Sequence, residues 1–111
     1  MIILTNKLVR DNIPDIIAKK GGRADVRILN DKEYRNELIT KMREETSEYE
    51  KDNNKEELAD MYEVLKALVE AHGTDMKEIE KIATQKREKN GAFEKRIFME
   101  CYHDGSCLRW C

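Results

Sequence analysis

The sequence has few aromatic residues and no long apolar run. With only two Phe and one Trp in 111 residues, its core must come mainly from Leu, Ile, Val, Met and Ala. No stretch approaches the roughly 18 apolar residues that a membrane-spanning helix needs. The opening MIILTNKLVR has too short an apolar run for a signal peptide. We therefore expect a cytoplasmic protein with no membrane partner and a modest core.

The sequence contains 21 basic and 23 acidic residues, which gives a net charge of −2 at pH 7. It therefore has no large excess of positive or negative charge. A protein that binds duplex nucleic acid through its phosphates normally carries an excess of Lys and Arg. The composition therefore argues against a nucleic acid polymer as partner. Binding of one or two phosphate groups stays open.

Cysteine is absent from residues 1–100, so disulfide bonds cannot form the framework of the fold. Cys101, His103, Cys107 and Cys111 follow the spacing C-x-H-x3-C-x3-C, which could hold zinc but matches none of the common zinc motifs. The alternative is a set of free thiols. We treat residues 103–111 as a C-terminal tail and expect no regular structure in it after His103.

The rest of the chain carries the pattern of amphipathic helices. A short helix is expected within residues 6–22, where Asp11 or Asn12 can act as the cap, Pro14 falls in the first turn and the glycine pair at 21–22 is the stop. We expect the helices to pair with those of another copy, because a thin layer of them buries little apolar surface alone.

A longer helix is expected from Asp31, and Asn53 or Asn54 can cap the helix that follows it, which ends at Gly73. The longer helix carries a stripe of larger side chains that is apolar except at one position: Tyr34, Leu38, Met42, Glu45 and Tyr49.

Thr74 can cap a further helix over residues 75–89. Alternating apolar residues predict two strands, at 23–29 and 93–102, that pair with each other. The fold class we expect is all-α: an antiparallel bundle of about four helices with this minor two-stranded antiparallel β element, formed by residues 1–102 and assembling as an oligomer.

Acidic residues stand where a core-facing helix should carry apolar ones, within residues 41–68. Glu45 and Glu48 are three apart on one helix and Glu57 and Asp60 on the next, so each pair shares a helix face. The short break between the pairs makes the two helices an antiparallel hairpin. Four facing carboxylates repel strongly without a cation between them, and ligation by oxygen alone suits Mg²⁺ or Mn²⁺.

Either pair alone could be a solvated face, because 40% of the residues are charged. Two pairs on consecutive helices, one of them on an apolar stripe, favour a metal site. Magnesium held by carboxylates completes its shell with waters and substrate phosphates, which predicts a polyphosphate substrate. Glu44 lies about 100° around the helix from Glu45 and could hold a second ion or accept the proton of the attacking water.

The pattern E-E-x-x-E followed by E-x-x-D on the next helix resembles the MazG-type all-α nucleoside triphosphate pyrophosphohydrolases. Three segments are similar to a phosphoribosyl-ATP pyrophosphohydrolase-like branch of that superfamily: KLVRDNIPDII at 7–17, EELADMYEVLKAL at 56–68 and KREKNGAFEKRIFM at 86–99. The resemblance covers about residues 5–100. Asn90 stands where that branch often has a basic residue or Gly.

This resemblance implies that Mg²⁺, or Mn²⁺ in its place, is bound by Glu45, Glu48, Glu57 and Asp60. Glu44 and Glu45 are then the catalytic candidates. The implied reaction is hydrolysis of a nucleoside triphosphate or phosphoribosyl nucleotide between the α and β phosphates, giving a monophosphate and pyrophosphate. The implied assembly is a homodimer or homotetramer, and the implied role is nucleotide-pool house-cleaning.

Basic residues near the two ends of the chain could bind the outer phosphates: Lys7, Arg10, Lys86, Arg87 and Arg96. Any one of them could equally be an exposed charge that balances its neighbours. We therefore expect them to act as a group. A different class of function also stays open, a noncatalytic helical dimer whose acidic cluster holds a structural cation or docks a basic partner.

Overall fold

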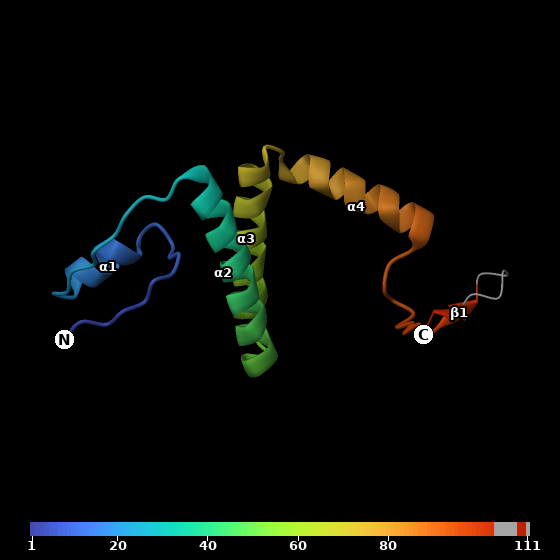
Figure 1. The fold of residues 1–111 in the computed structure, drawn as a ribbon, viewed down its shortest axis with the longest axis horizontal. Helices are drawn as coiled ribbons and strands as arrows, with labels where there is room; N and C mark the ends of the chain where they lie inside the picture. Colours follow the sequence, from blue (N-terminus) through green and yellow to red (C-terminus); the bar gives the residue numbers. More distant parts are fainter. Residues whose placement is uncertain (104–108, 111) are drawn as a thin grey trace. The chain divides into compact units, whose positions relative to one another are not determined.

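A computed structural model describes residues 1–103 and 109–110. This part of the chain contains four helices, α1 (Ile13–Lys19), α2 (Asp31–Asp52), α3 (Lys55–His72) and α4 (Met76–Asn90), and a short hairpin of β1 (Tyr102–His103) and β2 (Arg109–Trp110) (Figure 1). The predicted all-α class is confirmed. None of the helices in the described ranges combines the length and apolar character needed to cross a bilayer. Contacts divide the chain into two units, Met1–Ile79 and Glu80–Cys111.

Helices α2 and α3 form the hairpin that the sequence predicts (Figure 1). Asn30 begins α2 with a reciprocal cap, because its side chain accepts from the Glu33 N–H at 2.9 Å and the Glu33 carboxylate accepts from the Asn30 N–H. Only two residues join the helices. Asn53 adopts a left-handed conformation with φ of 52°, and Asn54 caps α3 by accepting from the Glu57 N–H at 3.1 Å. Because the connection is so short, α3 packs antiparallel to α2.

The apolar core of the first unit lies between these two helices. Leu38 of α2 is 2% exposed, and Val64 and Val69 of α3 are 8% and 5% exposed. The other apolar members of the predicted stripe are half-buried: Tyr34, Met42 and Tyr49. The face that the periodicity selects on α2 is therefore the face that packs on α3.

The boundary between α3 and α4 is close to the predicted one but uses a different cap. Gly73 ends α3 with φ of 92°, in the region that favours glycine. Asp75 rather than Thr74 caps α4, because it directly precedes Met76 and its carboxylate accepts from the Glu78 N–H at 2.8 Å. Thr74 is one residue too early for that bond, and its hydroxyl donates to the Glu78 carboxylate at 2.7 Å instead.

Helix α1 lies within the predicted range, with Asn12 at the cap position and Pro14 in the first turn. The Asn12 side chain makes no capping hydrogen bond. The predicted strand at 23–29 is not formed. This segment is irregular, and Arg27 near its end pairs with Glu33 of α2 at 2.9 Å.

The predicted pairing of residues 23–29 with 93–102 is wrong, since only Tyr102 of the second range belongs to a strand. Tyr102 instead pairs with Trp110 in the antiparallel β1–β2 hairpin. A local hairpin closes a much shorter loop than the predicted pairing, so its entropic cost is lower. The absence of structure expected after His103 is also wrong at β2 (Arg109–Trp110).

Part of the C-terminal tail lies outside the described residues, including Cys107 and Cys111. The zinc and free-thiol alternatives therefore both stay predictions. Of the four residues involved, the structure describes Cys101, which is half-buried, and His103, which is exposed. The division of the chain at residues 102 and 103 stays a prediction as well.

The small core makes its central leucine important for stability. Leu38→Ala should lower the free energy of unfolding by roughly 2–5 kcal/mol, because it deletes a buried side chain from a packed helix pair. Denaturant unfolding followed by circular dichroism measures the change. Arg43→Ala is the control, since Arg43 lies on the same helix and its side chain is exposed. Equal losses in the two variants would contradict a core centred on Leu38.

Candidate active site

The carboxylates predicted to bind metal come together on the α2–α3 hairpin. Glu45, Glu57 and Asp60 offer oxygen atoms that all lie within 4.8 Å of one another. A second group, also within 4.8 Å, contains Glu48, Asp52 and Glu57. Glu57 belongs to both groups. We call these five residues the acidic cluster.

The helices account for this convergence. Glu45 and Glu48 lie one turn apart on the face of α2 that packs on α3, and Glu57 and Asp60 lie one turn apart on α3. Because the two helices run antiparallel, the last turns of α2 face the first turns of α3. Asp52 is the member that the sequence reasoning missed. It is the last residue of α2 and stands four residues after Glu48, so it shares the face of Glu48.

Repulsion within the acidic cluster changes the titration of Glu57. Partial removal from water raises the pKa of Glu57 above its ordinary value of 4.5, and the nearby charges of Asp60, Asp52, Glu45 and Glu48 raise it further. The cluster thus disfavours its own negative charge at this position. A bound cation would instead favour the negatively charged form of Glu57.

Two predicted phosphate-binding residues contact carboxylates of the hairpin. A guanidinium nitrogen of Arg10 lies 2.6 Å from Asp60 Oδ1, and Lys7 Nζ lies 3.4 Å from Glu44 Oε1. Both cations come from the segment before α1, far from their partners in sequence. The structure therefore brings the beginning of the chain to the acidic cluster.

Lys41 is a third cation at this place, and the sequence reasoning missed it. Its Nζ lies 3.4 Å from Glu44 Oε1 and 3.5 Å from Glu45 Oε1. The side chains of Lys41 and Glu45 are only 17% and 12% exposed. The sequence does indicate these ion pairs, because Lys41 precedes Glu44 and Glu45 by three and four residues, the spacing of ion pairs on one helix.

A pocket of about 290 Å³ lies where the segment before α1 meets the hairpin. Its lining combines three cations, two carboxylates and two apolar side chains: Lys7, Arg10, Lys41, Glu45, Asp60, Val9 and Ile13. Its volume is at the lower end of the range for ligand pockets. Phosphate oxygens could contact the cations there while a metal ion contacts the carboxylates.

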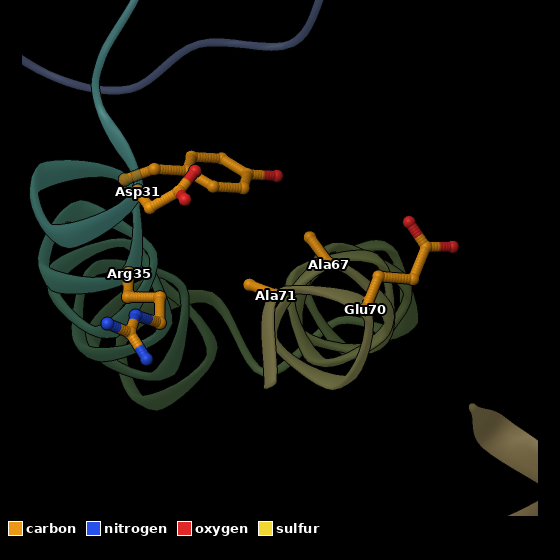
Figure 2. A pocket seen from close by; sticks show the side chains of 6 residues that line it. Asp31, Arg35, Ala67, Glu70 and Ala71 are labelled. Carbon is orange, nitrogen blue, oxygen red and sulfur yellow. The ribbon is translucent and has the colours of Figure 1, made fainter. Parts of the chain in front are cut away.

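A second pocket, of about 430 Å³, lies at the opposite end of the hairpin (Figure 2). Asp31 and Arg35 line it from the start of α2, and Ala67, Glu70 and Ala71 line it from the end of α3. None of the predicted site residues lines this pocket. The candidate chemistry therefore belongs to the smaller pocket.

Three more predicted phosphate-binding residues belong to the second unit. Lys86 and Arg87 lie near the end of α4, and Arg96 lies in the irregular segment after it with φ of 56°. All three are exposed. Their participation in phosphate binding stays a prediction.

Comparison of the chain with protein-family models, with curated proteins and with solved structures found no match. A functional assignment therefore depends on the residues and the geometry of this site.

The raised pKa of Glu57 predicts a pH-dependent stability. Between pH 4.5 and the raised pKa, the folded protein binds more protons at Glu57 than the unfolded chain does, so the free energy of unfolding falls as the pH rises through that window. In EDTA at pH 7, Glu57→Gln should therefore unfold at a higher temperature than Glu56→Gln. The difference should shrink as the pH falls below 4.5, because Glu57 is then increasingly protonated in both the folded and the unfolded protein.

Glu56 is the matched control because it lies in the same first turn of α3 but outside the acidic cluster. Both variants lose a charge that favours the helix dipole, so their difference reports the desolvation and the repulsion that raise the pKa of Glu57. Thermal unfolding followed by circular dichroism measures this difference. Equal midpoints at pH 7 would contradict a raised pKa at Glu57.

Proposed function

We propose that the chain is a Mg²⁺-dependent nucleotide pyrophosphohydrolase. It hydrolyses a nucleoside triphosphate or phosphoribosyl nucleotide between the α and β phosphates, in nucleotide-pool house-cleaning in the cytoplasm. The observation that carries the proposal is the convergence of Glu45, Glu57 and Asp60 beside a pocket that is also lined by lysine and arginine. Carboxylates suit a hard divalent cation, and the neighbouring cations suit phosphates.

The donor set fits Mg²⁺ or Mn²⁺. Every donor in the group of Glu45, Glu57 and Asp60 is a carboxylate oxygen. An octahedral Mg²⁺ with bonds of about 2.0–2.1 Å places its ligand oxygens about 3–4 Å apart. The oxygens of this group lie within 4.8 Å of one another, so small side-chain movements suffice. Glu48 would join from the second group through the shared Glu57.

The residues around this group have separate tasks in the proposed reaction. A bound Mg²⁺ would supply neutralisation of phosphate charge and a water molecule of lowered pKa. Glu44 lies beside the metal-binding group rather than in it and accepts the proton of the attacking water. Lys41 holds Glu44 and Glu45 in place through its two ion pairs. Lys7 and Arg10 bind the oxygens of the departing pyrophosphate, aided by Lys86, Arg87 and Arg96.

We further propose that the active form is a homodimer or homotetramer. Leu58, Tyr62 and Leu65 follow one another at helical spacing on α3 and are 47%, 53% and 39% exposed. Ile39 on α2 is 44% exposed. Apolar side chains at this spacing form a surface that a second hairpin could cover. Two hairpins packed in this way would complete an antiparallel bundle of four helices.

One observation favours the noncatalytic alternative, a helical dimer that docks a basic partner. The acidic residues of the hairpin already accept basic side chains of this chain, at Asp60 and at Glu44. Such a protein would gain thermal stability from Mg²⁺ but hydrolyse no nucleotide even at high protein concentration. Turnover therefore separates the two functions.

The enzyme proposal predicts pyrophosphate release from at least one member of a panel of nucleoside triphosphates and phosphoribosyl nucleotides with Mg²⁺. Glu45→Gln and Asp60→Asn should each lower kcat/KM at least about 100-fold, because each removes a metal-ligating charge. Glu50→Gln is the control, since Glu50 lies on α2 but outside the acidic cluster. Release of orthophosphate alone would mean that another bond is cleaved.

The assembly proposal predicts that Leu58→Lys combined with Leu65→Lys weakens self-association at least about 100-fold, because each leucine loses roughly 1.5–3 kcal/mol of burial. Light scattering after size-exclusion chromatography measures it. Glu63→Lys changes an exposed neighbour on α3 and should leave the assembly intact. A wild-type protein that is monomeric at all concentrations would refute the proposal.

A further inference from the structure

We propose that Arg10 binds two anions in turn: the Asp60 carboxylate when no metal is present, and a substrate phosphate once a divalent cation has taken Asp60. The inference rests on the proposed function, because it assigns an order of events to the same site. Binding of the metal to Asp60 would then free the Arg10 side chain to bind the substrate phosphate.

The geometry puts Arg10 and a divalent cation in competition for one carboxylate. Arg10 lies 2.6 Å from Asp60 Oδ1, and Asp60 is a member of the group with Glu45 and Glu57. A divalent cation ligated by Asp60 would bring its positive charge beside the guanidinium, and like charges so close repel. Each positive charge therefore weakens the hold of the other on Asp60.

The Arg10–Asp60 pair is placed where it can be broken at little cost. The side chains of Arg10 and Asp60 are 59% and 37% exposed, and exposed ion pairs stabilise proteins weakly. The backbone of Arg10 is held at the start of α1, because its carbonyl accepts from the Ile13 N–H at 3.1 Å. The exchange therefore needs only a movement of the arginine side chain.

Lys41 differs from Arg10 in its exposure and in its place in the fold. It also contacts a member of the acidic cluster, Glu45, but its side chain is only 17% exposed and it lies on α2 itself. Lys41 is thus part of the hairpin that carries the carboxylates. Among the cations that line the described pocket, Arg10 is the one that comes from outside the hairpin and contacts a member of the group Glu45, Glu57 and Asp60.

A phosphate group bound in the pocket would be the second partner of Arg10. Lys7 and Lys41 line the pocket together with Arg10, so a phosphate group there would meet three cations. A guanidinium can bind two oxygens of one phosphate at once, which an ammonium cannot do. Removing Arg10 should therefore have opposite effects, tighter metal binding and weaker substrate binding.

The test measures Mn²⁺ binding without nucleotide, from the electron paramagnetic resonance signal of free Mn²⁺, and then the KM for the nucleotide that is turned over. Arg10→Ala should bind Mn²⁺ about two- to fivefold more tightly than the controls, in line with the loss of one exposed ion pair. Its KM should rise about tenfold. Arg10→Lys should restore both values part of the way.

Two matched controls isolate the competition. Arg27→Ala removes an exposed arginine that pairs with Glu33 at 2.9 Å, away from the acidic cluster. Lys55→Ala removes a positive charge two residues from Glu57 and so reports the effect of charge through space. Circular dichroism shows whether each variant is folded.

Mn²⁺ affinity in Arg10→Ala that equals or falls below that of both controls would overturn the exchange, even if nucleotide is hydrolysed normally. Tighter Mn²⁺ binding with no turnover in any variant would support the competition at Asp60 and overturn the pyrophosphohydrolase proposal together with the phosphate step. Mn²⁺ binding by none of the proteins would overturn both proposals.

Discussion

Carboxylates at positions 45, 57 and 60 have oxygens within 4.8 Å of one another, and ionised groups at that separation repel. Basic side chains lie next to these carboxylates and reduce their mutual repulsion. Lys41 contacts the cluster from within α2, and Arg10 reaches it from the segment before α1. Helix packing holds the carboxylates together, and these cations offset part of the cost. The same two cations line the pocket beside Glu45 and Asp60.

Local signals in the sequence predict most of the hairpin. The cap at Asn53 or Asn54 and the stop at Gly73 depend on a few neighbouring residues, so the sequence predicts them without knowledge of the fold. The structure selects Asn54 as the cap and places Asn53 in a left-handed conformation. Helical periodicity likewise places Glu45 and Leu38 on the face that meets α3. The convergence of the carboxylates follows from these facts, because a two-residue connection leaves one arrangement for the helices.

The remaining features depend on tertiary partners that periodicity cannot specify. Alternation in residues 23–29 marks possible faces of a strand, but Val26 and Ile28 are 62% and 93% exposed, so no partner buries the face that these two residues share. Asp52 joins the acidic cluster through Glu57, which lies across the hairpin and so cannot be placed by the spacing along α2. The contact between Arg10 and Asp60 joins residues fifty positions apart and has no local signal at all.

The two-residue connection also limits how this chain can change in length. Each residue added to a helix turns everything beyond it by about 100° and moves it by 1.5 Å. One residue inserted between Asn54 and Glu57 would turn Glu57 and Asp60 away from Glu45, and it would also turn the core residues Val64 and Val69 away from Leu38. Extra residues between Asn53 and Asn54 would lengthen only the loop. Insertions that keep the carboxylates together should therefore be confined to the connection between these two asparagines.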